Sequence, residues 1–389
     1  MRLLFVAPRP FWPPRRGEQA RLVGWLSHLS QHHEVRVLAL APPGFDPLPA
    51  PVPAVQRFVP LPTLAALRGV LAHPWEPLQV GLHHHPAVVA ALRQELASFR
   101  PQVVVLMLSR VAFLQPHLGD LPVVVDFVDS LALNMRQRAK VQPLAAPLWL
   151  WEAWQCQRWD RKLLQQAAAG TVVAQRDKRA LAGGDPLLEE KLHVVPFGVP
   201  VPEAFPERKP EPATLLVTGN LGYFPTVAGV RWFVTRVWPQ LRQRRPQLAL
   251  VVAGARPARA IRRLARQGVE VVADPQSLAP LRQRATLLLA PLGPGSGTPI
   301  KVLEAMAAGV PVVASPHAAF GLDQLPREGI TVAEGPEAWV EAIEALLASP
   351  ERARQQAEAA YVWVKERHHL PRVAAAFEAL LESPAATSS

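Results

Sequence analysis

Short apolar runs alternate with segments of helical periodicity along most of the chain. Residues 3–7 form the first run, and a proline bounds it, as expected of a buried parallel strand. A loop of proline, arginine and glycine follows at 8–17, a helical pattern begins at Gln19, and residues 35–40 are largely apolar again. This order predicts a βαβ unit, whose right-handed crossover places the 8–17 loop at the carboxyl edge of the sheet.

The alternation continues on both sides of a proline-rich break. In the first half, further strands are expected at residues 103–108, 123–125, 170–174 and 192–195. Residues 196–212 contain six prolines, which neither a helix nor a sheet can accommodate, so this segment is expected to be an interdomain linker. In the second half, strands are expected at 214–218, 248–253, 269–272, 286–290 and 310–314, and helices at 226–243, 257–266, 277–284 and 299–308. We therefore predict two doubly wound, parallel-sheet α/β domains, residues 1–198 and 199–364.

Composition narrows the classes of partner. A chain of 389 residues is too long for one compact core, which agrees with two domains. The formal charge of +11 favours polyanionic partners such as nucleotide diphosphates, lipid phosphates or an anionic bilayer, whereas arginines spread along the chain argue against a nucleic-acid groove. Cys156 is the single cysteine and cannot form an internal disulfide. With no secretion signal and no apolar segment of ~18 residues, the expected location is cytoplasmic.

The stretch most informative about chemistry is GSGTPIKVLEAMAAGVPVVA, residues 295–314. Thr298 is the expected N-cap of a helix, Pro299 its first residue and Gly309 its stop. Glycines at 295 and 297 let the backbone approach a ligand closely. The free amides at the start of the helix, together with its dipole, then form an anion site.

Lys301 and Glu304 are three residues apart and share one face of this expected helix. A cation in the first turn opposes the helix dipole, so Lys301 is better explained if a phosphate binds there. Glu304 is then placed to accept hydrogen bonds from sugar hydroxyls, most simply those of a ribose. The alternative, to which spacing alone gives about equal weight, is an i,i+3 surface ion pair.

This segment resembles the donor-site signature of GT-B glycosyltransferases of family 4. The resemblance touches nearly the whole chain, because residues 10–40 are similar to the family's first strand–loop–helix unit and residues 217–242 to the opening of its C-terminal domain. VVDFVDS (124–130) resembles a bacterial subgroup associated with exopolysaccharide synthesis. The implied fold is GT-B, with two Rossmann-like domains, an interdomain cleft, a hinge at 196–212 and a helix at 365–389 that crosses back to the first domain.

The resemblance implies a retaining transferase that moves a sugar from a nucleotide-diphosphate sugar to a glycan, lipid-linked or small-molecule acceptor. It assigns the donor to Gly219, Ser296, Gly297, Thr298, Lys301 and Glu304. No cofactor and no metal are expected, because the helix start and Lys301 would stabilise the diphosphate leaving group. Ser296 stands where many relatives carry a glutamate for the donor sugar. Residues 220–225 hold no cation, which makes Arg231 and Arg256 candidate helpers.

The first domain supplies the remaining candidates. Gly17 could bring backbone amides to the donor or acceptor, or form a tight turn, and Glu18 and Arg21 would point into the cleft unless they are solvated helix-end charges. Asp126 and Asp129 follow an expected buried strand, so one of them could orient the acceptor hydroxyl or take its proton. Capping of a helix is the alternative for Asp129. Their D-x-x-D spacing differs from the D-x-D of metal-dependent transferases.

Two further clusters have structural and functional interpretations. The run His83-His84-His85 lacks accompanying Cys or carboxylate ligands and is expected to be a surface loop. The helical stretch 147–166 carries four tryptophans, Trp149, Trp151, Trp154 and Trp159, with Arg158, Arg161 and Lys162 nearby. Their spacing favours packing in the core or between the domains, and the alternative is peripheral contact with a bilayer. Other functions for the whole chain are a nucleotide-sugar epimerase, a basic binding protein without activity, and an oxidoreductase. The oxidoreductase is disfavoured because no GxGxxG follows an expected strand.

Overall fold

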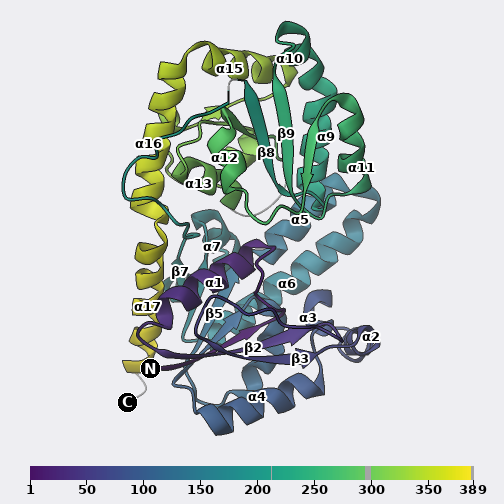
Figure 1. Cartoon of the computed structure of the whole chain (residues 1–389). Helices are drawn as coiled ribbons and strands as arrows, with labels where there is room; N and C mark the ends of the chain where they lie inside the picture. Colours follow the sequence, from purple (N-terminus) through teal and green to yellow (C-terminus); the bar gives the residue numbers. More distant parts are fainter. Residues whose placement is uncertain (212, 294–298, 387–389) are drawn as a thin grey trace. The chain divides into compact units, whose positions relative to one another are not determined.

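The computed structural model describes residues 1–211, 213–293 and 299–386, which form two compact α/β units (Figure 1). The first unit comprises residues 1–198 together with the chain from Pro371 onward, and the second comprises Val199–Leu370. The chain therefore returns to the first unit at Pro371, a few residues after the expected position 365. Among the described residues, no helix combines the length and the apolar character that crossing a bilayer requires.

The first unit is built on a parallel sheet of seven strands in the order β3-β2-β1-β4-β5-β6-β7. Its strands are β1 (Arg2–Ala7), β2 (Glu34–Ala41), β3 (Val55–Pro60), β4 (Val103–Met107), β5 (Val123–Val128), β6 (Ala169–Val172) and β7 (Leu192–Val194). Its helices are α1 (Gly17–Leu29), α2 (Thr63–Ala72), α3 (Leu78–Gly81), α4 (Pro86–Phe99), η1 (Ser109–His117), α5 (Leu131–Val141), η2 (Pro143–Ala145), α6 (Ala146–Gln166), α7 (Gln175–Ala182), α8 (Pro186–Lys191) and α17 (Leu370–Ala386).

Alternate residues of β1 enter different layers of this unit, because successive side chains of a strand point to opposite faces. Leu4 and Val6 pack with apolar residues of α4 and α6, whereas Leu3 and Phe5 pack with residues of α1 and α17. The sheet is thus covered by helices on both faces, which explains why its strands appear in the sequence as continuous apolar runs.

The second unit repeats the architecture on six parallel strands in the order β10-β9-β8-β11-β12-β13. These are β8 (Thr214–Asn220), β9 (Ala249–Ala255), β10 (Glu270–Ala273), β11 (Leu287–Ala290), β12 (Val312–Ala314) and β13 (Thr331–Val332). The helices are α9 (Phe224–Arg236), α10 (Trp238–Arg244), α11 (Arg259–Arg262), η3 (Arg263–Gln267), α12 (Ala279–Arg284), α13 (Ile300–Ala307), α14 (Pro316–Ala319), η4 (Arg327–Gly329), α15 (Pro336–Ala348) and α16 (Pro350–His368). The prediction of two doubly wound parallel-sheet domains is confirmed.

One predicted helix is two helices in the structure. Residues 226–243 were expected to be continuous, but α9 ends at Arg236 and α10 begins at Trp238. Pro239 explains the break, because proline donates no backbone hydrogen bond and restricts the residue before it. Gly309, by contrast, ends α13 as predicted, with the left-handed φ of 68° that glycine accepts without strain.

Most of the proline-rich segment expected to be the interdomain linker is bound to the second unit, which begins at Val199. Val199 exchanges backbone hydrogen bonds with His368 and Leu370, and the Tyr361 hydroxyl donates to the carbonyl of Pro202 at 2.6 Å. Arg208 donates to the carbonyls of Gly309, Arg282 and Ala285. The chain passes between the units at 198/199 and again at 370/371.

Helix α17 completes the first unit by packing on α1. The rings of Trp25 and Phe377 stack at 4.5 Å between centroids. The Glu378 carboxylate pairs with His28 at 2.8 Å and with His33 at 2.7 Å. Burial alone would raise the pKa of Glu378, but the two histidine hydrogen bonds lower it. The last helix is therefore part of the first unit's core and not an appendage.

Candidate active site

Helix α13 carries Lys301 and Glu304, the two predicted donor residues of the segment 295–314 that the structure describes. It begins at Ile300, so Pro299 precedes the helix and is not its first residue. Ser296, Gly297 and Thr298, including the N-cap expected of Thr298, lie outside the described residues. Lys301 falls in the first turn of α13 and Glu304 one turn later, after the chain has left β11 at its carboxyl end.

Glu304 holds two cations on one carboxylate oxygen. Its Oε2 accepts from Arg282 at 2.9 Å and from Lys301 at 3.1 Å. The ion-pair alternative is thus present in the structure, but all three side chains keep partial exposure, with 42% for Lys301, 25% for Glu304 and 17% for Arg282. Two cations against one carboxylate leave a net positive charge, which suits a diphosphate. Sequence reasoning missed Arg282, because it reaches Glu304 from a different helix.

The carboxyl end of β8 approaches its neighbours very closely. A Cβ atom on Gly254 of β9 would lie 1.8 Å from the carbonyl oxygen of Gly219, and one on Gly222 would lie 2.8 Å from that of Arg256. Arg256 is exposed and follows directly after β9, so of the two predicted helpers it is the one beside the β8–α9 turn. Arg231 lies on α9 and is also exposed.

In the first unit, Asp126 and Arg21 form a buried ion pair. Arg21 Nε donates to Asp126 Oδ2 at 2.7 Å, with 1% and 0% of the side chains exposed. Asp126 also accepts from Thr171 Oγ1 at 2.8 Å and from Trp25 Nε1 at 3.3 Å. Arg21 donates onward to the Pro196 carbonyl. The expectation that Arg21 points into a cleft is corrected: it lies in the interior, because Asp126 offers it a buried partner.

The backbone is strained at the ends of β4 and β5. Leu108 and Val128 both have a φ of 66°. Residues other than glycine rarely adopt this conformation, and it is especially unfavourable for a β-branched residue such as Val128. Such strain persists only where surrounding contacts enforce it, and it clusters at functional sites. Asp129 follows this kink and is half-buried. The capping alternative for Asp129 is wrong, because Ser130 caps α5 by accepting from the Leu133 amide.

A second group of charges surrounds Arg110 at this edge of the first sheet. Burial lowers the pKa of Arg110, and the charges of Glu18 and Asp129 oppose that shift. Its Nε donates to Gln79 Oε1 at 2.6 Å. Glu18 is paired with Arg9 at 2.5 Å, so it is not merely a solvated helix-end charge. Gly17 is the first residue of α1, beside Glu18.

Two buried acids of α6 lie near this group and were not predicted. Burial raises the pKa of Asp160 to about 7, although a hydrogen bond with Ser109 lowers it in part and the charge of Asp129 raises it further. Burial also raises the pKa of Glu152, and the Leu78 amide donates to its carboxylate at 3.2 Å. The pattern contained a signal: residues 152, 156, 160 and 163 recur at helical spacing on the buried face of α6. The Cys156 thiol lies on this face, and burial raises its pKa.

The histidine run lies in the loop between α3 and α4, as expected, but its three side chains are half-buried. Burial lowers the pKa of His83 to about 4, so its ring is neutral, and His85 caps α4. The ring of His84 stacks on His73 at 3.7 Å between centroids. His73, Glu76 and His84 bring three potential metal ligands within 4.8 Å of one another, and a more exposed group of His33, Glu378 and Glu382 does the same.

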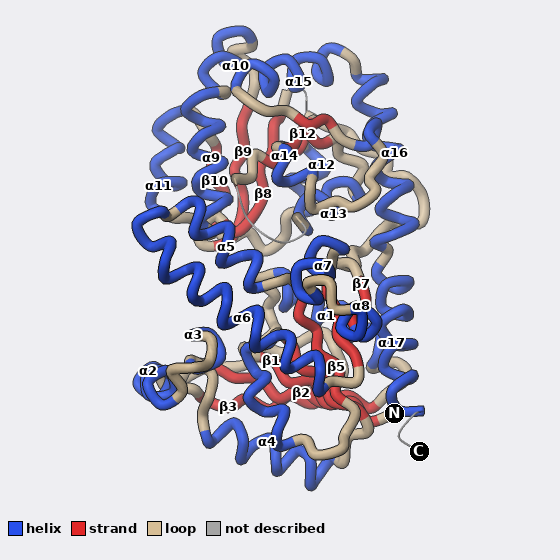
Figure 2. The backbone as a smooth tube through the Cα atoms, turned by 180° about the vertical axis from the view of Figure 1, so that it is seen from behind, coloured by secondary structure: helices blue, strands red, loops and turns tan. Residues whose placement is uncertain are grey.

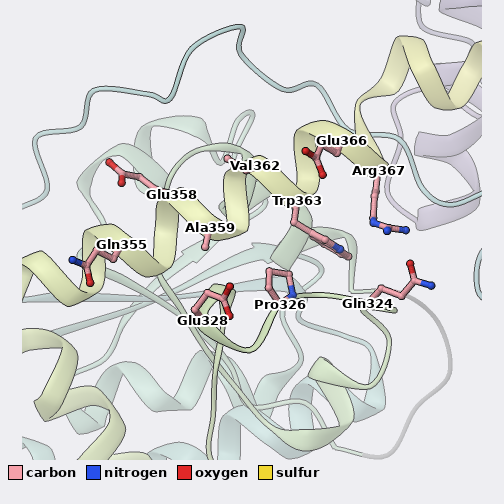
Figure 3. A pocket seen from close by; sticks show the side chains of 10 residues that line it. All are labelled: Gln324, Pro326, Glu328, Gln355, Glu358, Ala359, Val362, Trp363, Glu366 and Arg367. Atoms are coloured by element: carbon pink, nitrogen blue, oxygen red, sulfur yellow. The ribbon is translucent and has the colours of Figure 1, made fainter.

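A hollow of about 590 Å³ in the second unit lies apart from the predicted donor residues. It runs along α16, opposite the segment with Gln324 and Pro326 (Figure 3). Its carboxylates are Glu328, Glu358 and Glu366, with Arg367 at one end. Three carboxylates would repel a diphosphate, so this hollow does not suit the predicted donor.

Comparisons with known proteins bear on the class of protein and on the fold. Residues 212–349, within the second unit, match the family model described as glycosyl transferases group 1. The search of curated proteins gave no match. The fold is similar over the whole chain to that of sucrose-phosphate synthase from Thermosynechococcus elongatus, with a TM-score of 0.74, 14% identity and 100% of both chains covered.

Two other solved structures extend the likeness. HepE of Anabaena, in complex with UDP, has a TM-score of 0.67 at 14% identity, covering 98% of this chain and 100% of its own. WaaG, a glycosyltransferase involved in lipopolysaccharide biosynthesis, has a TM-score of 0.64 at 16% identity, covering 96% and 98%. At such identities the likeness shows the fold, which is GT-B. Together, the fold and the match over residues 212–349 support a glycosyltransferase.

Proposed function

We propose that this protein is a retaining glycosyltransferase of the family 4 type, which transfers a sugar from a nucleotide-diphosphate sugar to a glycan or lipid-linked acceptor. The observation that carries the proposal is the group of Arg282, Lys301 and Glu304 inside the matched segment 212–349. The resemblance of residues 124–130 to an exopolysaccharide-associated subgroup suggests that the sugar transfer serves exopolysaccharide synthesis. We also propose that the protein is cytoplasmic.

The donor is proposed to bind the second unit through its diphosphate. Lys301 and Arg282 would exchange part of their contact with Glu304 for phosphate oxygens, and this exchange is open to them because the side chains are partly exposed. The Glu304 carboxylate would then accept from ribose hydroxyls. Positive charge fixed beside the leaving diphosphate stabilises the charge that develops as the glycosidic bond breaks, so no metal is needed for this step.

The acceptor is proposed to bind the first unit, near Asp129 and Arg110. Asp129 follows a strained turn and its carboxylate is the candidate for orienting the acceptor hydroxyl. Asp126 is proposed only to hold Arg21 and the end of β5 in place. Its carboxylate is fully buried and already accepts hydrogen bonds from three donors. It is therefore a positioning residue in this scheme and not a proton acceptor.

The proposal is tested by thermal-shift measurements with UDP, GDP, ADP, dTDP and NAD, without added metal. A ligand at about 100 times its dissociation constant stabilises the protein by about 2.7 kcal/mol. We expect one nucleoside diphosphate, with UDP the first choice because it is bound in HepE, to stabilise the wild type and not Glu304→Ala. Glu344→Ala is the matched control, because Glu344 also pairs with an arginine on the second unit.

Two outcomes would contradict the proposal. Stabilisation by NAD alone would indicate an oxidoreductase, and equal stabilisation of wild type and Glu304→Ala would remove Glu304 from the donor site. Product analysis on the stabilising nucleotide's sugars then separates transfer from epimerisation, and the anomeric configuration of the product tests retention.

A further inference from the structure

Helices α5 and α6 form a hairpin in the first unit (Figure 2). This hairpin exposes large apolar and basic side chains. Its exposed apolar residues are Leu144, Leu148, Leu150, Trp151 and Trp154, with 49–102% of each residue accessible. Its exposed charged residues are all basic: Arg136, Arg138, Lys140, Arg158 and Lys162. The only acids in the fully described segment 131–162 are Glu152 and Asp160, and both are buried at 3% and 2% exposure. We call these ten exposed residues the α5–α6 face.

Helical geometry places the α6 members of this face on one side. At 3.6 residues per turn, Leu148, Trp151, Trp154 and Arg158 follow one another within about a third of the circumference. Glu152, Cys156, Asp160 and Leu163 occupy the opposite, buried side. The two acids of α6 therefore lie on its buried side, beside Leu163 and Leu164, whereas large apolar side chains lie on its exposed side.

Internal contacts stabilise the aromatic side chains without covering them. The rings of Trp151 and Trp154 lie 5.2 Å apart, and the Arg158 guanidinium lies 5.3 Å from the ring of Trp154. Trp149 is half-buried under Arg138, at 3.8 Å. The expectation that these tryptophans pack in the core thus holds for Trp159, which packs against the first unit's core, and in part for Trp149. It fails for Trp151 and Trp154, each of which is 49% exposed.

A second apolar stripe lies beside the first. Helix α2 exposes Leu64, Leu67 and Leu71 at 53–81%, and Trp75 follows at 74%. The Trp75 carbonyl accepts a hydrogen bond at 2.9 Å from Nε2 of Gln155, the residue of α6 that follows Trp154. No acid occurs in the sequence between Asp46 and Glu76. The segment that follows α2 therefore contacts α6 at Trp75.

We propose that the α5–α6 face, extended by the α2 stripe, docks the first unit on the surface of an anionic bilayer. Charge complementarity identifies this occupant: a face with five cations and no exposed acid matches anionic headgroups, and would repel a second copy of itself. Tryptophan and leucine beside arginine and lysine are the side chains that enter the boundary between headgroups and acyl chains. This inference does not depend on sugar transfer, although it would favour a lipid-linked acceptor.

Co-sedimentation of the full-length protein with vesicles tests the proposal. We expect binding to phosphatidylglycerol-containing vesicles, and little binding to vesicles of phosphatidylcholine alone. Trp151→Gln with Trp154→Gln should weaken binding by about tenfold or more, because both apolar anchors are lost. Arg158→Gln with Lys162→Gln should weaken it by about fivefold per residue and should reduce its salt dependence.

Matched controls come from the second unit. Phe320→Gln with Val362→Gln removes two exposed apolar side chains, of 68% and 51% exposure, and should leave vesicle binding unchanged. Quenching by brominated lipid reports the location directly: it should be strong in the wild type, weaker in Trp151→Phe with Trp154→Phe, and largely lost when Trp75→Phe is added, because Trp75 is exposed on the α2 stripe. Circular dichroism and thermal unfolding verify that each variant is folded.

Three outcomes would overturn the proposal. These are equal binding of the wild type and the folded tryptophan variant, absence of binding to anionic vesicles, and a wild-type dimer in sedimentation equilibrium that the tryptophan variant loses while vesicles bind neither form. The nucleotide thermal-shift assay on the same variants keeps the two hypotheses separate. A variant that loses vesicle binding but is still stabilised by nucleotide is impaired only in the α5–α6 face. A variant that binds vesicles but is no longer stabilised by nucleotide is impaired only in the donor site.

Discussion

The two units share a topology but treat the charges near their strand ends in opposite ways. In the first unit, the side chains of Arg21 and Asp126 are at most 1% exposed, and Trp25 and Thr171 donate further hydrogen bonds to Asp126. In the second unit, Arg282, Lys301 and Glu304 keep 17–42% of their side chains exposed. One set of charges is sealed in the protein, and the other is open to solvent.

The difference separates charges that build a fold from charges that can bind a ligand. Removing one partner from a sealed pair leaves a buried charge without compensation, which costs several kcal/mol. An exposed pair contributes about 0–1 kcal/mol to stability, so its members can take another partner at little cost. Acidic and basic residues near strand ends are therefore ambiguous in a sequence until their burial is known.

The largest effect is expected from breaking the sealed pair. Asp126→Ala should lower the free energy of unfolding by about 3–5 kcal/mol, because Arg21 remains charged and buried. Denaturant unfolding of the full chain measures this. Replacing both members, Arg21→Met with Asp126→Leu, should recover most of the loss, since no buried charge is left. A stable Asp126→Ala protein without transferase activity would show that the buried pair is not needed for stability. Asp126 would then again be a candidate catalytic residue.

A pH-dependent effect is expected at Asp160. Burial raises its pKa to about 7 in the folded protein, above the ordinary value of 3.8, so the folded state binds the proton more tightly than the unfolded state. Stability should therefore fall as pH rises from about 4 through about 7, and the loss should persist at higher pH. Asp160→Asn keeps a neutral side chain, and should exceed the wild type by about 4 kcal/mol near pH 8 and match it near pH 4.

Urea unfolding at the two pH values measures this difference. Asp120→Asn is the control, because Asp120 is an exposed aspartate of the same unit. If the gain of Asp160→Asn were the same at both pH values, its origin would be a packing change and not the buried ionisation.

The positions of strands could be predicted from the sequence where both faces of a strand are buried. Runs such as Val103–Met107 are apolar throughout, because helices cover both sides. Strand β3 (Val55–Pro60) was missed, because only Val59 of it is buried and the run is not apolar. Residues 196–212 were recognised as a break from their prolines, but the contacts of Arg208 with three distant carbonyls leave no local pattern.

In the candidate site, too, only contacts within one element could be predicted from the sequence. The contact of Lys301 with Glu304 follows from their spacing on one helix. Arg282 could not be assigned, because its contact with Glu304 joins two helices separated by strand β11. Burial decided the remaining cases: the same residue types that suggested a cleft in the first domain proved to be interior at Arg21 and Asp126.

The smallest effect on stability is expected in the open set, where binding should change most. Arg282→Met and Lys301→Met should each alter the free energy of unfolding by no more than about 1 kcal/mol, because the pairs are partly solvated. Each should weaken binding of the nucleoside diphosphate by about tenfold or more, since a charge-assisted hydrogen bond contributes about 1.5–3 kcal/mol. Calorimetric titration measures the affinity, with Arg244→Met as control for an exposed pair elsewhere on the second unit. Should Arg282→Met destabilise the protein strongly while leaving nucleotide affinity unchanged, the second set of charges would prove as structural as the first.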